Sequence, residues 1–110
     1  MRMDKVRGLN HIGIDLDTKN RLRLLISYFN ARHLFPGKDI RVYETKMGHH
    51  LEILGIKSNL IARMILGDCP DRLWFSEERM RIFKRDFDDV LFNIKDGYKR
   101  EEVNVFSEAW

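Results

Sequence analysis

Residues 12–17, with the sequence Ile-Gly-Ile-Asp-Leu-Asp, constrain the fold of this chain most strongly. Three aliphatic residues alternate with a glycine and two aspartates, which is the two-residue period of a β-strand with one buried face. The same period places Asp15 and Asp17 together on the other face, about 7 Å apart along the strand. Two carboxylates at this spacing repel each other unless water, a base or a cation compensates them. The segment therefore predicts a strand that carries an acidic pair.

The segment after this strand has the three- and four-residue spacing of an amphipathic helix. Asp17 or Thr18 is expected to cap its first turn, and the Pro-Gly pair at 36–37 is expected to end it near His33 or Leu34. The apolar residues that we expect to face the core are Leu22, Leu25, Ile26 and Phe29. Residues 1–8, which precede the strand, are expected to form a frayed end.

Two strands joined by a short turn are predicted between residues 40 and 54. Residues 40–45 are rich in β-branched and aromatic residues, and residues 49–54 alternate between apolar and polar side chains. The turn at residues 46–48 ends in Gly48, which can adopt positive φ. This pattern is typical of a β-hairpin.

Two helices and a strand are expected in the remainder of the chain. Ser58 and Gly67 are expected to cap the first helix, a loop follows at 67–72, and the second helix is expected to begin at Ser76. The charged residues of this region are expected to form caps and surface ion pairs: Asp68, Asp71, Arg72, Glu77, Glu78, Arg79 and Arg81. Residues 90–95 predict the last strand. Residues 103–106 are expected to add an edge strand or to pack against a partner.

This order of elements predicts an α+β fold over residues 1–110 as a single domain. Short connections and right-handed crossovers convert it into a ferredoxin- or RRM-like split βαβ fold, with a four-stranded antiparallel sheet and helices on one face. The other face is expected to be open to solvent. Alternation along the strands places these residues on it: Asp15, Asp17, His50, Glu52, Asp89, Leu91 and Asn93.

The composition limits the environment of the protein. A single cysteine, Cys69, rules out an internal disulfide framework and suits a reducing, cytoplasmic setting. No apolar run reaches the 18 residues of a membrane span, so we expect no membrane partner. The net charge of +3 is compatible with binding of a polyanion such as nucleic acid.

The open face contains a candidate metal site. In the predicted fold, the first and last strands can bring Asp15, Asp17 and Asp89 to one shallow site, with His50 beside them. Three carboxylates suit Mg²⁺ or Mn²⁺, which prefer hard oxygen ligands and hold phosphates. The alternative is that these are solvated polar residues on an exposed sheet.

Residues 14–17 resemble the first motif of the archaeo-eukaryotic primase superfamily, hydrophobic-Asp-hydrophobic-Asp. Residues 47–53 are similar to its second motif, a glycine-containing turn followed by histidine and a strand, and Asp89 before a strand is similar to its third. The resemblance implies a minimal palm with an RRM-like core, in which Asp15, Asp17 and Asp89 are the catalytic metal ligands. It further implies metal-dependent nucleotidyl transfer in replication or repair. The chain also resembles small proteins of archaeal viruses and plasmids.

The same resemblance makes nucleoside triphosphates and nucleic acid the expected partners. His50 is the implied nucleotide contact, and Lys46 in the preceding turn is expected to hold phosphate. The expected nucleic-acid contacts are Arg21, Arg23, Arg41 and Tyr43, because cations hold phosphates and aromatic rings stack on bases.

Two other functions stay open. One is a small metal-dependent nuclease of the CRISPR-adaptation type, whose first strand and arginine-bearing helix resemble residues 14–15 and 21–23. The other is a non-catalytic nucleic-acid-binding or homodimeric assembly module, in which the C-terminal tail forms the dimer contact.

Overall fold

The computed structural model of the protein describes residues 5–7, 10–85, 88–92, 94–95 and 97–106. Its strands are β1 (Lys5–Arg7), β2 (His11–Leu16), β3 (Ile40–Glu44), β4 (His49–Leu54), β5 (Val90–Phe92), β6 (Ile94–Lys95), β7 (Tyr98–Lys99) and β8 (Glu101–Glu102). Its helices are α1 (Arg21–Leu34), α2 (Leu60–Ile65) and α3 (Pro70–Phe83).

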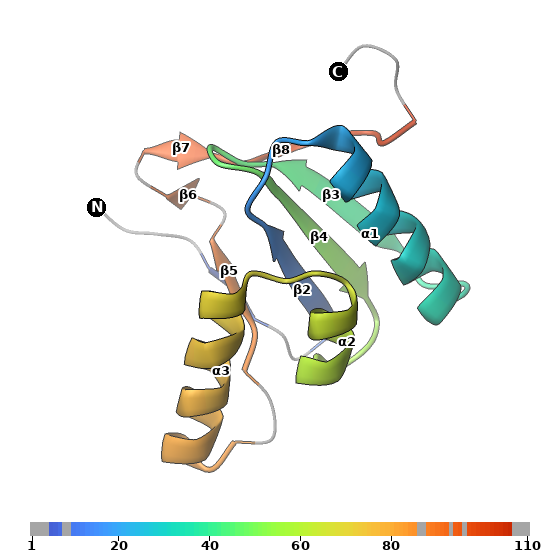
Figure 1. Ribbon diagram of the computed structural model, residues 1–110. Helices are drawn as coiled ribbons and strands as arrows, with labels where there is room; N and C mark the ends of the chain where they lie inside the picture. Colours follow the sequence, from blue (N-terminus) through green and yellow to red (C-terminus); the bar gives the residue numbers. More distant parts are fainter. Residues whose placement is uncertain (1–4, 8–9, 86–87, 93, 96, 107–110) are drawn as a thin grey trace.

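The central sheet has four antiparallel strands in the order β2-β4-β3-β8 (Figure 1). Both β2 and β3 pair with β4, so they run parallel to each other and are connected through α1. The predicted α+β class and four-stranded antiparallel sheet are confirmed. The fourth strand, however, is β8 from the C-terminal segment, because the segment predicted at 90–95 divides into β5, which pairs with β1, and β6, which pairs with β7.

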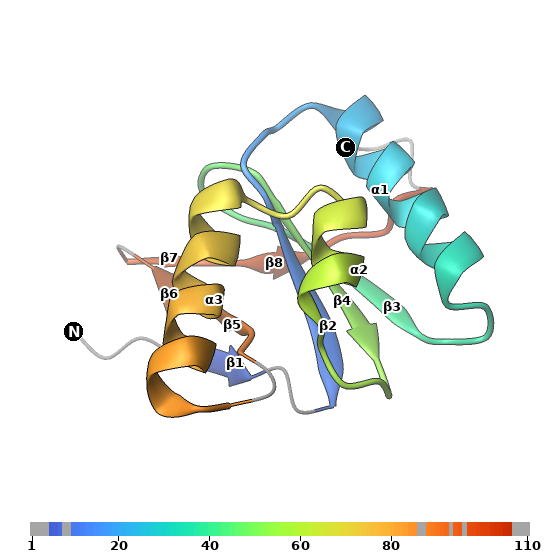
Figure 2. The ribbon, with the colours of Figure 1, turned by 60° about the horizontal axis from the view of Figure 1, so that its bottom comes forward.

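The three helices lie side by side over one face of this sheet, with α2 between α1 and α3 (Figures 1 and 2). The hydrophobic core lies between the two layers and consists of Ile12, Ile14, Leu16, Leu24, Tyr28, Ala31, Ile40, Val42, Leu51, Ile53, Ala62, Leu66 and Val105. The aliphatic face of β2 is therefore buried as predicted. Among its described side chains, α3 contributes none to this core, and Ser76 is its buried residue. Other contacts must hold α3 in place.

Helix α1 buries a different face from the predicted one. Its buried residues are Leu24, Ser27, Tyr28 and Ala31, whereas Leu22, Ile26 and Phe29 are exposed and Leu25 is half-buried. The predicted cap is also wrong, because the side chain of Asn20 accepts hydrogen bonds from the backbone N–H groups of residues 22 and 23. The helix ends at Leu34, as expected.

The region from 58 to 83 differs from the prediction in two ways. Asn59 caps α2 by accepting a hydrogen bond from the Ala62 N–H at 2.8 Å, so the Ser58 hydroxyl serves another role. The predicted loop at 67–72 is wrong beyond Cys69, because α3 begins at Pro70 and not at Ser76. Proline suits the first position of a helix, where its missing N–H has no partner to lose.

The described residues nearest to the two ends of the chain take part in the fold. Residues 5–7, expected to be frayed, form β1 against β5. The N–H of Val103 donates to the carbonyl of Val42, Val105 enters the core, and the Phe106 ring packs on Tyr28. The described part of the tail thus packs on its own chain, where a dimer contact was predicted. In the described residues, no helix has the length and apolar character needed to cross a membrane.

Candidate functional site

The outer edge of β2 is hydrogen-bonded to three side chains and to one backbone N–H where a neighbouring strand would otherwise lie. The N–H of Gly13 donates to Asp89 Oδ2 at 2.6 Å, and Arg72 Nη1 donates to the Gly13 carbonyl at 2.9 Å. The N–H of Asp15 donates to Asp68 Oδ1 at 2.7 Å, and the Cys69 N–H donates to the Asp15 carbonyl at 3.0 Å. Unpaired backbone groups at a sheet edge are costly when buried. These groups therefore satisfy the edge of the sheet.

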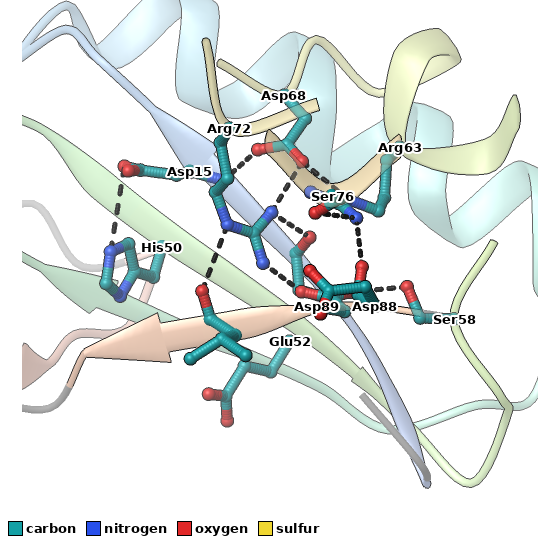
Figure 3. A network of polar contacts seen from close by, with 12 residues as sticks. Asp15, His50, Glu52, Ser58, Arg63, Asp68, Arg72, Ser76, Asp88 and Asp89 are labelled. Atoms are coloured by element: carbon teal, nitrogen blue, oxygen red, sulfur yellow. Dashed lines mark hydrogen bonds and ion pairs between the residues drawn. The ribbon is translucent and has the colours of Figure 1, made fainter. Parts of the chain in front are cut away.

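Three arginines (63, 72 and 79) and three aspartates (68, 88 and 89) form the polar network behind this edge, and Figure 3 labels all of these except Arg79. Arg72 from α3 forms ion pairs with both Asp68 and Asp89. Arg63 from α2 donates to Asp68 Oδ2 at 2.7 Å and to the carbonyl of Asp88 at 2.6 Å. Equal numbers of opposite charges allow the groups to be buried together, because each charge keeps a partner.

The network also fixes α3 against the rest of the fold. Arg63 Nη1 donates to Ser76 Oγ at 3.0 Å, and Arg79 forms an ion pair with Asp88 at 2.7 Å. Burial would raise the pKa of Asp88, but hydrogen bonds from Arg79 and Ser76 and the charges of Arg79 and Arg63 hold it below its usual value. Helix α3 is thus attached through polar contacts, which explains why it supplies no core residue among those described.

Asp68, Arg72 and Arg79 were predicted as caps and surface ion pairs, and that prediction is wrong for Asp68 and Arg72, whose side chains are 0% and 11% exposed. Arg63, whose side chain is 1% exposed, was not singled out in the sequence. One sequence signal could have revealed the members of the network on α3. Pro70 marks a helix start, and it places Arg72, Ser76 and Arg79 on one side of α3 at three- and four-residue spacing.

The three predicted metal ligands occupy different environments. Asp89 is 1% exposed, and its carboxylate binds the Gly13 N–H, the Ser58 hydroxyl and Arg72. Asp17 is exposed and lies 3.7 Å from Cys69 Sγ. In the described residues, no group of three or more His, Cys, Asp or Glu side chains could hold a metal ion. The residues present do not fit a Mg²⁺ or Mn²⁺ centre made by Asp15, Asp17 and Asp89.

Asp15 instead faces His50, across the paired strands β2 and β4. The Asp15 carboxylate lies 3.6 Å from His50 Nε2, and Nδ1 of the same ring lies 3.2 Å from Arg100 Nη1. A guanidinium has only donors, so Nδ1 must accept and a neutral His50 carries its proton on Nε2, toward Asp15. The two residues that resemble the first and second motifs are therefore brought together.

Arg100 covers the sheet face that was predicted to be open. Its guanidinium lies 2.8 Å from Glu52 Oε2 and 3.7 Å from the centre of the Tyr43 ring. His50 and Glu52 are 6% and 4% exposed as a result. On the same face, Leu91 lies where a Cβ on Gly13 would be, so β5 covers part of β2. The prediction of an open face is wrong, and Asn93 lies outside the described residues.

The predicted nucleic-acid contacts are divided between the two layers. Arg21 and Arg23 belong to α1, where the Arg21 guanidinium donates to the carbonyl of Val105 at 3.2 Å. Arg41 and Tyr43 belong to β3 and point to the opposite face, with Tyr43 under Arg100. Lys46 is exposed in the turn between β3 and β4. The structure does not bring these five residues to one surface.

His49 lies on the helical side of β4 and gives the fold a pH dependence. Its ring is 1% exposed, and Nδ1 donates to the Thr18 carbonyl at 3.1 Å. Burial lowers the pKa of His49, and the hydrogen bond to Thr18 offsets this only in part. The folded protein therefore binds the proton less readily than the unfolded chain does.

We expect stability to decrease as the pH falls below about 6.5, the ordinary pKa of histidine, because the unfolded chain then takes up the proton first. Urea denaturation at pH 7.5 and pH 5.5 measures this loss. His49→Asn should reduce the difference in the free energy of unfolding between pH 7.5 and pH 5.5. His33→Asn, which changes an exposed residue of α1, should leave this difference unchanged. An equal pH dependence in the parent and in His49→Asn would contradict this assignment.

Comparison with known proteins does not identify a relative. No family model, curated protein or solved structure matches the chain. The function must therefore be argued from the residues of this chain.

Proposed function

We propose that this protein is a nucleic-acid-associated module with a ferredoxin- or RRM-like, palm-like sheet, in which the acidic residues stabilise the fold. The contact between Asp15 and His50 carries this proposal. It supports the resemblance to the primase palm, because the acid of one motif and the histidine of the other face each other from adjacent strands. The parallel strands β2 and β3 on either side of β4 fit the same arrangement.

The environment of Asp89 favours a structural role over a catalytic one. A metal ion at this carboxylate would have to displace Arg72, which also binds Asp68 and the Gly13 carbonyl. Breaking a buried ion pair typically costs about 3–5 kcal/mol. The proposal therefore assigns no metal-dependent step to Asp15, Asp17 and Asp89.

Nucleic acid would contact the cations along β3 and in the β3–β4 turn. Arg41 near the start of β3 and Lys46 in the turn are exposed, and Lys19 reaches the Thr45 carbonyl in the same turn. Cations of this kind bind phosphates, which gives affinity without sequence specificity. The ring of Tyr43 is covered by Arg100, so base stacking is not part of the proposal. His50 is buried and engaged on both nitrogens, so the phosphate contact is assigned to Lys46.

The test is binding of fluorescent single-stranded DNA and RNA, measured by anisotropy between 50 and 300 mM salt. We expect affinity to fall with salt. Arg41→Ala/Lys46→Ala should make the log–log slope shallower by about one for each phosphate that the variant no longer neutralises. The matched control is Arg23→Ala, which removes an exposed cation from the helical layer. Salt-independent binding, no binding at 50 mM salt, or an equal effect of the control would overturn the proposal.

A further inference from the structure

Helices α1 and α2 carry exposed apolar side chains at helical spacing, and α3 carries an exposed adjacent pair. The side chains concerned are Leu22, Ile26 and Phe29 in α1, Ile61, Met64 and Ile65 in α2, and Trp74 and Phe75 in α3, with exposed fractions between 51% and 71%. Single exposed apolar residues are normal on a protein surface, but repeated stripes on neighbouring elements indicate an interface.

The stripe on α1 lies opposite its buried face. At 100° per residue, Leu22, Ile26 and Phe29 lie within about 60° of one another and about 180° from Leu24 and Ala31. On α2, the exposed residues likewise alternate with buried Ala62, Arg63 and Leu66. The helices form one layer over the sheet (Figure 2), so the exposed stripes of α1 and α2, which lie opposite their buried residues, face away from the same core.

The apolar area of this layer is large for a monomer. The eight side chains together expose roughly 900 Å², given about 150–250 Å² for a whole large side chain. The largest apolar patch of a typical monomer is about 300–600 Å². Each partner in a standard interface contributes about 800 Å². The helical layer is therefore large enough to form a stable protein–protein interface.

The charges on the two outer helices are complementary. Helix α1 contains no acidic residue, and Arg23, Arg32 and His33 are exposed on it. Helix α3 turns Arg72 and Arg79 toward the buried network, and Asp71 and Glu77 are exposed on it. Arg81 is also exposed on α3 and forms an ion pair with Glu78 at 2.6 Å. The α1 edge of the layer is therefore basic, and the first part of α3, residues 70–78, is acidic on its exposed side.

We propose that a second copy of this chain packs on the helical layer, with α2 beside the two-fold axis and α1 of each copy against α3 of the other. A two-fold axis brings the same patch of both copies together. Because α2 lies between α1 and α3 (Figure 1), a two-fold axis that runs along α2 in the plane of the interface pairs the basic edge of one copy with the acidic edge of the other. The same contact buries the apolar stripes of both copies.

Sedimentation velocity from 1 to 200 µM tests the proposal. We expect the parent to be dimeric and Ile61→Glu to weaken dimerisation at least 100-fold, because two buried carboxylates then meet near the axis. Leu22→Glu is a second variant on the neighbouring helix. The matched control is Met47→Glu, which changes a side chain that is 69% exposed but lies in the β3–β4 turn. Circular dichroism checks that each variant is folded.

Charge reversal tests the pairing of α1 with α3. At low salt, Arg23→Glu and Glu77→Arg should each weaken the dimer several-fold, and combining them should restore affinity. A monomeric parent would overturn the proposal and assign the layer to another protein. A dimer that Ile61→Glu leaves intact, or that Met47→Glu weakens equally, would also overturn it. Failure of the double variant to regain affinity would refute the α1–α3 pairing.

Discussion

Replacing Asp89 with asparagine should lower the free energy of unfolding by about 3 kcal/mol, because it leaves a buried arginine without its carboxylate. Asp89 binds Arg72, the Ser58 hydroxyl and the Gly13 N–H at once. Asparagine keeps a carbonyl for the Gly13 N–H but cannot compensate the charge of Arg72. Urea denaturation at pH 7.5, fitted to a two-state transition, measures the change.

The control for this experiment is Asp17→Asn, since Asp17 is the exposed member of the predicted acidic group. Its substitution should change stability by less than about 0.5 kcal/mol. A metal-binding role for Asp89 makes the opposite prediction. Removing a repulsive carboxylate from a metal site would stabilise the metal-free protein. Mn²⁺ would also raise the urea concentration at the midpoint of unfolding for the parent but not for Asp89→Asn. That combination would refute the structural role assigned to Asp89.

The elements that could be predicted from sequence are those with a regular local pattern. Strand β4 has the predicted bounds, His49 to Leu54, because apolar and polar residues alternate there and glycines stand on both sides. The aliphatic face of β2 was predicted for the same reason. Local periodicity determines which face of such a strand is buried, since a shift by one residue would expose all of its aliphatic side chains.

The buried face of α1 could not be predicted from periodicity, because the helix has two apolar faces. Leu22, Ile26 and Phe29 satisfy the spacing of a buried stripe better than the actual buried set, which contains Ser27. Burial of Ser27 depends on a distant partner, since its hydroxyl donates to the Leu66 carbonyl at 2.7 Å. A second apolar face is expected where a helix also contacts another protein, in agreement with the proposed dimer.

The polar network could not be predicted for a related reason: its contacts join residues far apart in the chain. Asp89 binds the backbone of Gly13, 76 residues away, and Asp68 binds that of Asp15, 53 residues away. Spacing along one helix shows which charges share a side but not which carboxylate lies opposite them. The acidic residues were noticed in the sequence, but their partners, Arg63 and Arg72, determine that they are structural.

Replacing Gly48 with alanine should lower the free energy of unfolding by about 3 kcal/mol, at the upper end of overpacking effects. A Cβ at this position would lie 1.9 Å from the carbonyl oxygen of Leu16 and 2.7 Å from the nitrogen of Thr18. Both are backbone atoms, so no side-chain rotation can relieve the contact. The predicted reason for this glycine, positive φ, is wrong, since the positive-φ glycines of the described chain are at 37, 55, 67 and 97.

Gly37→Ala is the matched control, because it separates backbone conformation from lack of space. Gly37 has a φ of 80°, and a Cβ there meets nothing within 4 Å, so alanine should cost only about 1 kcal/mol. Urea denaturation of both variants decides between the two causes, and an equal cost would contradict the close approach at Gly48. The close packing of Gly48 against Leu16 and Thr18 also positions residues of the candidate site. It holds the start of β4 against residues 16–18, which places His49 on the Thr18 carbonyl and His50 opposite Asp15.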